Sequence, residues 1–157
     1  GQQPMIVHRD LKSLNLLLAA PLRSKLDVPT VKLCDFGSSR FMPAGVTLTK
    51  NVGTLHWMAP EVAAGEYDEK VDVYSFGIVT YELLCLEIPF ADFTEREITH
   101  AVSKGIRPSL ETANDAAPEV LLRLMEQCWA QSPGERPCFK EISSVFFAHK
   151  LHSCCSL

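Results

Sequence analysis

The sequence predicts a single, mainly α-helical domain that carries one small β-hairpin. A chain of 157 residues with 46% hydrophobic and 22% charged residues has the size and composition of one ordinary globular domain. The segment 68–86 carries apolar residues on every side, which is typical of a helix buried at the centre of a domain. Two apolar runs, at 16–18 and 31–34, flank a polar connection and predict a pair of short strands.

The first predicted elements are the strands. Ile6 and Val7 form a short apolar lead-in, and Leu16–Leu18 predicts a buried strand. The polar, proline-containing segment 19–30 connects this strand to the next one at 31–34. This connection is long and carries no apolar pattern, so we expect its residues 21–25 to form a surface loop.

The remaining predicted elements are helices. Pro89 is expected to stop the central helix, and Thr94 with Glu97 forms a capping box that begins a second helix, which closes at Gly105. Pro118 and Pro137 open two more helices. The residues of these last two helices that we expect to face inward are Val120, Leu121, Leu124, Cys128, Phe139, Ile142 and Phe146.

Composition excludes several classes of protein. A formal net charge of −4 argues against a general nucleic-acid or anionic-membrane binder. The sequence contains no uninterrupted run of 18 apolar residues, so no membrane span is predicted. The six cysteines form no C-x-x-C pair, which predicts reduced thiols in a cytoplasmic protein rather than disulfides or a zinc site. The tail Cys154–Leu157 fits a prenylation box only formally, since Ser156 is not aliphatic. We expect a domain over 1–149 and a disordered tail over 150–157.

Three motifs stand in order along the chain. They are His8-Arg9-Asp10-Leu11-Lys12-Ser13-Leu14-Asn15, Asp35-Phe36-Gly37 and Ala59-Pro60-Glu61. At a residue usage of about 5% per type, the five fixed positions of the first motif recur about once in several million windows. The three motifs match the catalytic loop, the magnesium-binding turn and the end of the activation segment of protein kinases. From about Pro4 to His149 the chain resembles the C-terminal lobe of a eukaryotic protein kinase, an α+β fold.

The resemblance implies a set of chemical roles. Asp10 would be the base that accepts the proton of a substrate hydroxyl, beside Arg9, and Lys12 would neutralise charge on the transferred phosphoryl group. Asn15 and Asp35 offer the hard oxygen ligands that Mg²⁺ selects, so they would bind the magnesium that bridges the ATP phosphates. Leu17 would lie under the adenine ring. A lone Asp in a turn is usually a helix or turn cap. Here Asp10, Asn15 and Asp35 are all present in the order that the kinase motifs require.

Other positions carry over as supports of the site. His8 and Phe36 resemble two side chains that stack in active kinases, with Gly37 completing the turn. Asp72, on the buried helix, resembles the acid that accepts amides from the catalytic loop, as a buried carboxylate requires. Thr54 would contact Asp10 and Lys12. Glu61 and Arg136 resemble the ion pair that ties the activation segment to the last helices.

Smaller signals indicate the substrate class. Lys12 and the run Gly53–Glu61, which has no proline before Trp57, are similar to serine/threonine kinases, so the expected partners are proteins with Ser or Thr hydroxyls. Ser13, Trp57 and the pairs Cys128-Trp129 and Arg136-Pro137 favour the tyrosine-kinase-like group, which includes mixed-lineage and Raf-like kinases. Cys34 would line the rear of the ATP site, or is simply a small apolar strand residue.

The 157 residues contain no G-x-G-x-x-G and no Val-Ala-Ile-Lys-like run, and they begin at Gly1. We therefore expect a fragment without the N-terminal lobe that is inactive alone, exposes apolar surface around Leu17 and self-associates. Two alternatives stay open: a non-catalytic interaction module, and a tyrosine or dual-specificity kinase.

The segment between Gly37 and Gly53 resembles an activation loop. We predict regulatory phosphorylation at Thr49, with Thr47 second, by an upstream kinase or by autophosphorylation. The cation that would read this phosphate is Arg9, which we expect to be unpaired before modification.

Overall fold

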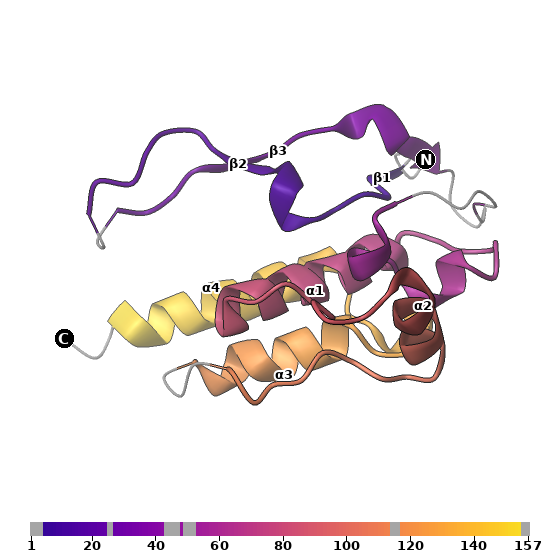
Figure 1. The fold of residues 1–157 in the computed structure, drawn as a ribbon. Helices are drawn as coiled ribbons and strands as arrows, with labels where there is room; N and C mark the ends of the chain where they lie inside the picture. The colour runs from indigo at the N-terminus through magenta and orange to yellow at the C-terminus, as the bar shows by residue number, and fades with distance from the viewer. Residues whose placement is uncertain (1–4, 25–26, 43–47, 49–52, 114–116, 155–157) are drawn as a thin grey trace.

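The computed structural model describes residues 5–24, 27–42, 48, 53–113 and 117–154. Within this part of the chain, a layer of helices lies beside a thin layer of strands and turns (Figure 1). The helices are α1 Lys70–Cys85, α2 Glu95–Ser103, α3 Glu119–Cys128 and α4 Phe139–Cys154. The strands are β1 Met5–Val7, β2 Leu16–Leu18, β3 Val31–Leu33 and β4 Arg40–Met42. Short 3₁₀ turns join them: η1 Ser13–Asn15, η2 Phe36–Ser38, η3 Leu55–Trp57, η4 Pro60–Val62 and η5 Pro133–Glu135.

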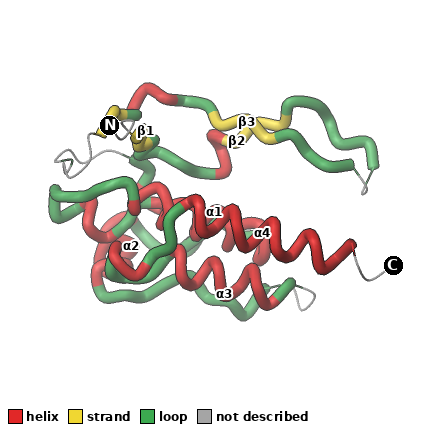
Figure 2. The backbone as a smooth tube through the Cα atoms, turned by 180° about the vertical axis from the view of Figure 1, so that it is seen from behind, coloured by secondary structure: helices red, strands yellow, loops and turns green. Residues whose placement is uncertain are grey.

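The predicted hairpin is present, and a second sheet accompanies it. Strands β2 and β3 pair antiparallel with Leu17 opposite Lys32. The connection between them extends from the strands in the direction of the C-terminal end of α4 (Figure 2), and its described residues are exposed. Strand β1 pairs antiparallel with β4, with Ile6 opposite Phe41. In the sequence, Ile6 and Val7 are recognisable only as a short apolar lead-in, because strands of three residues are too short for an alternating pattern to stand out.

The prediction that Leu16–Leu18 is a buried strand is wrong. Leu17 and Leu18 are 52% and 51% exposed, and Val31 opposite Leu18 is 49% exposed. The cause is the thinness of the strand layer, since within the described residues no further layer covers its outer face (Figure 1). The expected apolar surface around Leu17 is therefore present.

Helix α1 is the centre of the core, as its all-round apolar pattern predicts. Tyr74 and Ile78 have no exposed surface, and α1 packs closely against α3. A Cβ added to Gly77 would lie 2.9 Å from the Cβ of Cys128, so the close approach of the two helices depends on this glycine. The helix ends at Cys85, before Pro89, because Leu86 adopts a left-handed conformation with φ 56°.

The other helices follow their predicted start signals. The side chain of Thr94 accepts a hydrogen bond from the Glu97 amide while the Glu97 carboxylate accepts one from the Thr94 amide, so the capping box is confirmed. Pro118 directly precedes α3, in which Leu124 and Cys128 are buried as expected.

Two details of α4 differ from the expectation. Ile142 is buried, but Phe139 and Phe146 are 44% and 42% exposed, because α4 carries aromatic residues on more sides than its neighbours can cover. The helix also runs to Cys154, beyond the domain end expected at 149, since 139–154 contains no glycine or proline that would stop it.

Two further expectations concern chemistry and membranes. Cys34, Cys85, Cys128 and Cys138 are free thiols, and burial raises the pKa of the Cys128 thiol to about 12. No helix in the described part of the chain combines the length and the apolar character that crossing a membrane requires.

Candidate active site

The segment between β1 and η1 is held in place by Asp72 of α1. One carboxylate oxygen accepts a hydrogen bond from the His8 amide at 2.6 Å, and the other accepts one from the Arg9 amide at 2.8 Å. Arg9 has a left-handed backbone with φ 68°, a conformation that costs an ordinary residue about 1–3 kcal/mol. Burial raises the pKa of the Asp72 carboxyl, although the two amides oppose this shift. The predicted contact between Asp72 and this loop is present.

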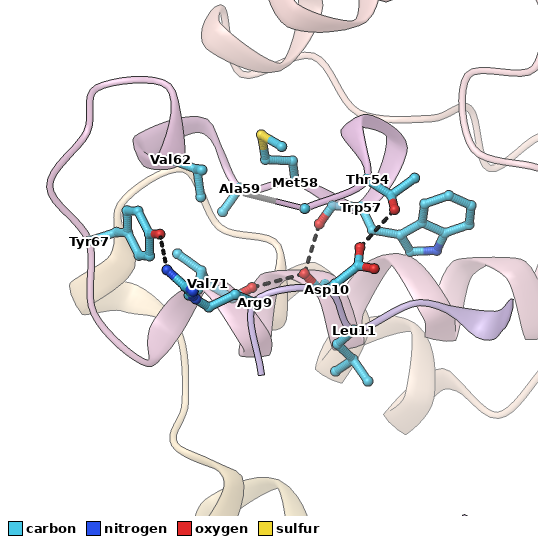
Figure 3. A pocket seen from close by; sticks show the side chains of 12 residues that line it. Arg9, Asp10, Leu11, Thr54, Trp57, Met58, Ala59, Val62, Tyr67 and Val71 are labelled. Atoms are coloured by element: carbon cyan, nitrogen blue, oxygen red, sulfur yellow. Dashed lines mark hydrogen bonds between the residues drawn. The ribbon is translucent and has the colours of Figure 1, made fainter. Parts of the chain in front are cut away.

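Asp10 lies where two segments meet. Its carboxylate accepts a hydrogen bond from Lys12 Nζ at 2.8 Å. It also accepts one from the Thr54 hydroxyl at 2.7 Å (Figure 3). Lys12 Nζ also donates to Thr54 Oγ1 at 2.6 Å, which closes a triangle of three side chains. Thr54 therefore contacts both Asp10 and Lys12, as expected from the sequence.

The Asp10 carboxyl is poised to stay ionised. Burial acts to raise its pKa, but the hydrogen bonds from Lys12, Thr54 and Asn15 and the charge of Lys12 together lower it below the ordinary value. Because the folded-state pKa is lowered, these contacts stabilise the fold above the ordinary carboxyl pKa, and this contribution is lost as the pH falls through the lowered value.

Gly53 allows the segment 53–61 to lie against the loop of Asp10. Its φ of 130° suits glycine alone, and an added Cβ would lie 2.8 Å from the carbonyl oxygen of Arg9. A larger residue would push Thr54 away from Asp10, so the sequence Gly53-Thr54 is what brings the two segments together.

The chain folds Asn15 and the turn 35–37 close to the same loop. Asn15 is buried, and its Nδ2 donates to the Asp10 carbonyl oxygen at 2.8 Å. Asp35 is exposed, has a left-handed φ of 62° and accepts a hydrogen bond from the Gly37 amide. The rings of His8 and Phe36 meet edge to face at 4.9 Å, so the predicted pair is in contact with its rings steeply inclined. Leu17 follows Asn15 on β2 with its side chain half exposed.

Comparison with known proteins identifies the group to which this site belongs. A family model described as the protein kinase domain matches residues 2–147. The chain belongs to the protein kinase domain family.

Several curated protein kinases are similar to this chain. A probable serine/threonine-protein kinase of Dictyostelium discoideum is 42% identical over 142 residues, which make up 89% of this chain and 14% of that protein. A serine/threonine-protein kinase of Arabidopsis thaliana is 39% identical over 142 residues, 89% of this chain and 23% of that protein. A dual specificity protein kinase of D. discoideum is 38% identical over 151 residues, 92% of this chain and 27% of that protein. This kinase chain thus spans less than a third of each of these relatives.

Membership of the kinase family implies the use of ATP and a divalent metal, and the oxygen donors fit such a group. Among the hydrogen bonds of the described residues, none uses Asn15 Oδ1, and Asp35 presents an exposed carboxylate. The described residues hold no cluster of three or more His, Cys, Asp or Glu side chains that could enclose a metal. Carboxylate and amide oxygens are donors that a hard divalent cation accepts.

Arg9 of this kinase domain differs from the expectation of an unpaired cation. The side chain is buried, and its Nε donates to the Ser38 carbonyl oxygen at 2.6 Å. Its Nη1 donates to the Tyr67 hydroxyl at 3.3 Å (Figure 3). A buried guanidinium needs acceptors, and the left-handed backbone at Arg9 accompanies a side chain turned away from Asp10 towards them. The candidate phosphorylation sites Thr47 and Thr49 lie outside the described residues.

The expected ion pair between Glu61 and Arg136 is present. Nη1 and Nη2 of Arg136 donate to the two carboxylate oxygens of Glu61 at 2.5 and 2.9 Å, and the arginine side chain has no exposed surface. The guanidinium also donates to the carbonyl oxygens of Ala130 and Lys70, and it lies over the Tyr74 ring. Arg136 thus joins η4, η5 and the start of α1.

Sequence reasoning missed two anchors of this site on α1. The Ser75 hydroxyl donates to the Trp57 carbonyl oxygen at 2.8 Å, and Glu82 accepts hydrogen bonds from both Ser13 and Trp57. The available signal was the helical spacing, since Ser75 and Glu82 fall on the side of the helix that carries Asp72. A polar residue on an otherwise apolar helix needs a polar partner. From the sequence such a partner is predicted for Asp72 but not for Ser75 or Glu82.

Proposed function

We propose that this chain is the C-terminal lobe, over residues 1–149, of a serine/threonine protein kinase of the tyrosine-kinase-like group. The reaction is the Mg-ATP-dependent transfer of the γ-phosphate to Ser or Thr hydroxyls of proteins in signalling. The observation that carries the proposal is the position of the Asp10 carboxylate, which accepts hydrogen bonds from Lys12 and Thr54. The side-chain amide of Asn15 lies on the same loop as Asp10 and donates to its carbonyl oxygen. The free thiols of the described residues are compatible with a cytoplasmic protein.

In the proposed reaction Asp10 accepts a hydrogen bond, and then the proton, from the substrate hydroxyl. A carboxylate with a lowered pKa is a weak base, so its first task is to orient the hydroxyl for in-line attack. Lys12, 2.8 Å from Asp10, supplies a cation next to the transferred phosphoryl group. Asn15 and Asp35 would hold Mg²⁺, which would supply positive charge to neutralise the phosphates of ATP. Leu17 would lie beneath the adenine.

Substrate class is inferred from residues and from relatives. Lys12, Ser13 and Trp57 support a serine/threonine kinase of the tyrosine-kinase-like group. Two of the three relatives described above are named serine/threonine-protein kinases. A dual-specificity kinase is the second candidate, because one relative with 38% identity is named as such.

The direct test is phosphorylation by the purified full-length protein of a peptide library with Ser, Thr or Tyr as acceptor. We expect labelled phosphate on Ser and Thr peptides, none on Tyr peptides, and none on either without a divalent metal. The 157 residues alone should be inactive, because they contain no Gly-rich loop or strand lysine to position ATP. Robust activity of the 157 residues would overturn that expectation. Tyr labelling would favour the second candidate, and an inactive full-length protein would favour the interaction module.

We also expect phosphorylation of Thr49, with Thr47 second, to raise activity. Arg9 uses two of its five N–H groups in the hydrogen bonds to Ser38 and Tyr67, so a phosphate carrying nearly two negative charges can be paired by the others. Mass spectrometry of the active full-length protein should find the modification, and Thr49→Ala should reduce activity. Loss of the modification in an Asp10→Asn variant would indicate autophosphorylation rather than an upstream kinase. Full activity of the Thr47→Ala, Thr49→Ala double variant contradicts the switch.

A further inference from the structure

We propose that Glu82 of α1 is a positioning residue that fixes the catalytic loop, residues 8–15, relative to the substrate-binding run, residues 53–61. The inference rests on the proposed function and adds a residue to which no motif assigned a role. Glu82 is half-buried and accepts two hydrogen bonds through different oxygens. The Ser13 hydroxyl donates to Oε1 at 2.7 Å, and the Trp57 indole Nε1 donates to Oε2 at 2.8 Å.

The two donors belong to the two segments that meet at Asp10. Ser13 directly follows Lys12 in the catalytic loop, and Trp57 lies three residues after Thr54 in the substrate-binding run. Lys12 and Thr54 are the side chains that hold the Asp10 carboxylate. The two segments are therefore connected twice. Asp10 connects them through Lys12 and Thr54, and Glu82 of α1 connects them through Ser13 and Trp57.

A carboxylate suits this position better than a neutral amide does. Each of its oxygens accepts one neutral donor, and hydrogen bonds to an ionised acceptor are about twice as strong as neutral ones. Glutamine has the same shape but a single oxygen, so its amide group would face either the Ser13 hydroxyl or the Trp57 indole. The indole N–H can only donate, so the glutamine oxygen must face Trp57, and the Ser13 hydroxyl must then rotate to accept from the amide instead of donating. Both contacts become hydrogen bonds between neutral groups and lose the strength that the negative charge gives them.

Ser75, the second anchor on α1, allows the local role of Glu82 to be distinguished from a general contribution to the stability of the fold. Ser75 holds the Trp57 backbone through its carbonyl oxygen at 2.8 Å, so the main chain of η3 stays attached when Glu82 is changed. What a change at Glu82 releases is the indole of Trp57 and the hydroxyl of Ser13. The expected consequence is a shift of the run relative to Asp10, with the fold retained.

The test compares Glu82→Gln, Ser13→Ala and the double variant in the full-length protein, with Glu126→Gln as control. Glu126 is an exposed residue of α3, so the control makes the same chemical change away from the site. A Ser peptide selected from the library serves as substrate. We expect Glu82→Gln to lower kcat/KM for the peptide about tenfold and to raise its KM, with KM for ATP unchanged within about twofold.

Non-additivity is the sharper part of the experiment. Without the Ser13 hydroxyl, Glu82→Gln weakens only the hydrogen bond to the Trp57 indole, so it should cost about threefold instead of tenfold in the Ser13→Ala background. Additive effects, or a loss of kcat with both KM values unchanged and a parallel loss of folded protein, would overturn the inference and leave the kinase function standing. A wild-type protein that phosphorylates no peptide would remove the proposed function and this inference with it.

Discussion

Asp10→Asn in the full-length protein is expected to abolish phosphate transfer. The substitution keeps the shape of the side chain but removes the charge that the network of Lys12 and Thr54 holds at 2.8 and 2.7 Å. Loss of a general base costs about 10²–10⁴-fold in rate, and here one of the two acceptor oxygens is also replaced by an amide NH₂, which cannot accept the hydrogen bond of the substrate hydroxyl. Steady-state kinetics with a Ser peptide measures the effect.

Asp35→Asn is expected to be as inactive, for a different reason. Asp35 is an exposed carboxylate that would hold the metal, whereas Asp10 makes its hydrogen bonds to protein groups. Residual activity of Asp35→Asn should therefore rise with added Mg²⁺, and that of Asp10→Asn should not. A matched control is Asp27→Asn, since Asp27 lies in the exposed connection between β2 and β3. The same Mg²⁺ dependence in both variants would contradict the assignment of the two roles.

The pH profile gives a second test of Asp10. Because its pKa is lowered in the folded protein, the carboxylate stays charged as the pH falls through the ordinary carboxyl range. The acidic limb of kcat/KM for the wild-type protein should therefore lie below that range. Thr54→Val removes one of the hydrogen bonds that lower this pKa and should move the limb to higher pH. An unmoved limb in this variant would mean that another group controls it.

The parts of the fold that follow from the sequence are those coded by local or strongly periodic patterns. The capping box of α2 needs only Thr94 and Glu97, three residues apart, and the buried helix α1 follows from apolar residues on all its sides. The pairing of β1 with β4 joins Ile6 to Phe41 across 35 positions, and strands of three residues carry no period that would reveal it. The burial of Phe139 and Phe146 failed because it depends on which neighbours cover α4 rather than on the helix itself.

The site divides in the same way. The motif residues Asp10, Asn15 and Asp35 could be proposed from the sequence, because their order and spacing are specific. The surroundings of Arg9 could not be predicted, because its acceptors, Ser38 and Tyr67, lie 29 and 58 positions away. Glu82 was overlooked for the same reason, since its two donors are 69 and 25 positions away. Long-range polar contacts need the fold before they can be assigned.

Removal of Glu61 or Arg136 is expected to produce the largest loss of stability. Breaking one partner of a buried ion pair typically costs about 3–5 kcal/mol, because the other charge loses its compensation. The sequence alone would make the two substitutions nearly equal, whereas the contacts of Arg136 favour a larger effect of its loss. Arg136→Ala also leaves the carbonyl oxygens of Ala130 and Lys70 without their donor and removes the cation from the Tyr74 ring.

Urea unfolding of the complete kinase domain, followed by tryptophan fluorescence, measures these effects. We expect Glu61→Ala near the lower end of that range and Arg136→Ala near its upper end, with the double variant costing clearly less than the sum. Arg123→Ala is the matched control, because Arg123 and Glu119 also approach within 2.5 Å but are 72% and 76% exposed. Solvent screens such a pair, so its loss should leave the midpoint unchanged. Additive effects of Glu61→Ala and Arg136→Ala would show that the two side chains are not coupled, and a control as costly as Glu61→Ala would show that burial is not the cause.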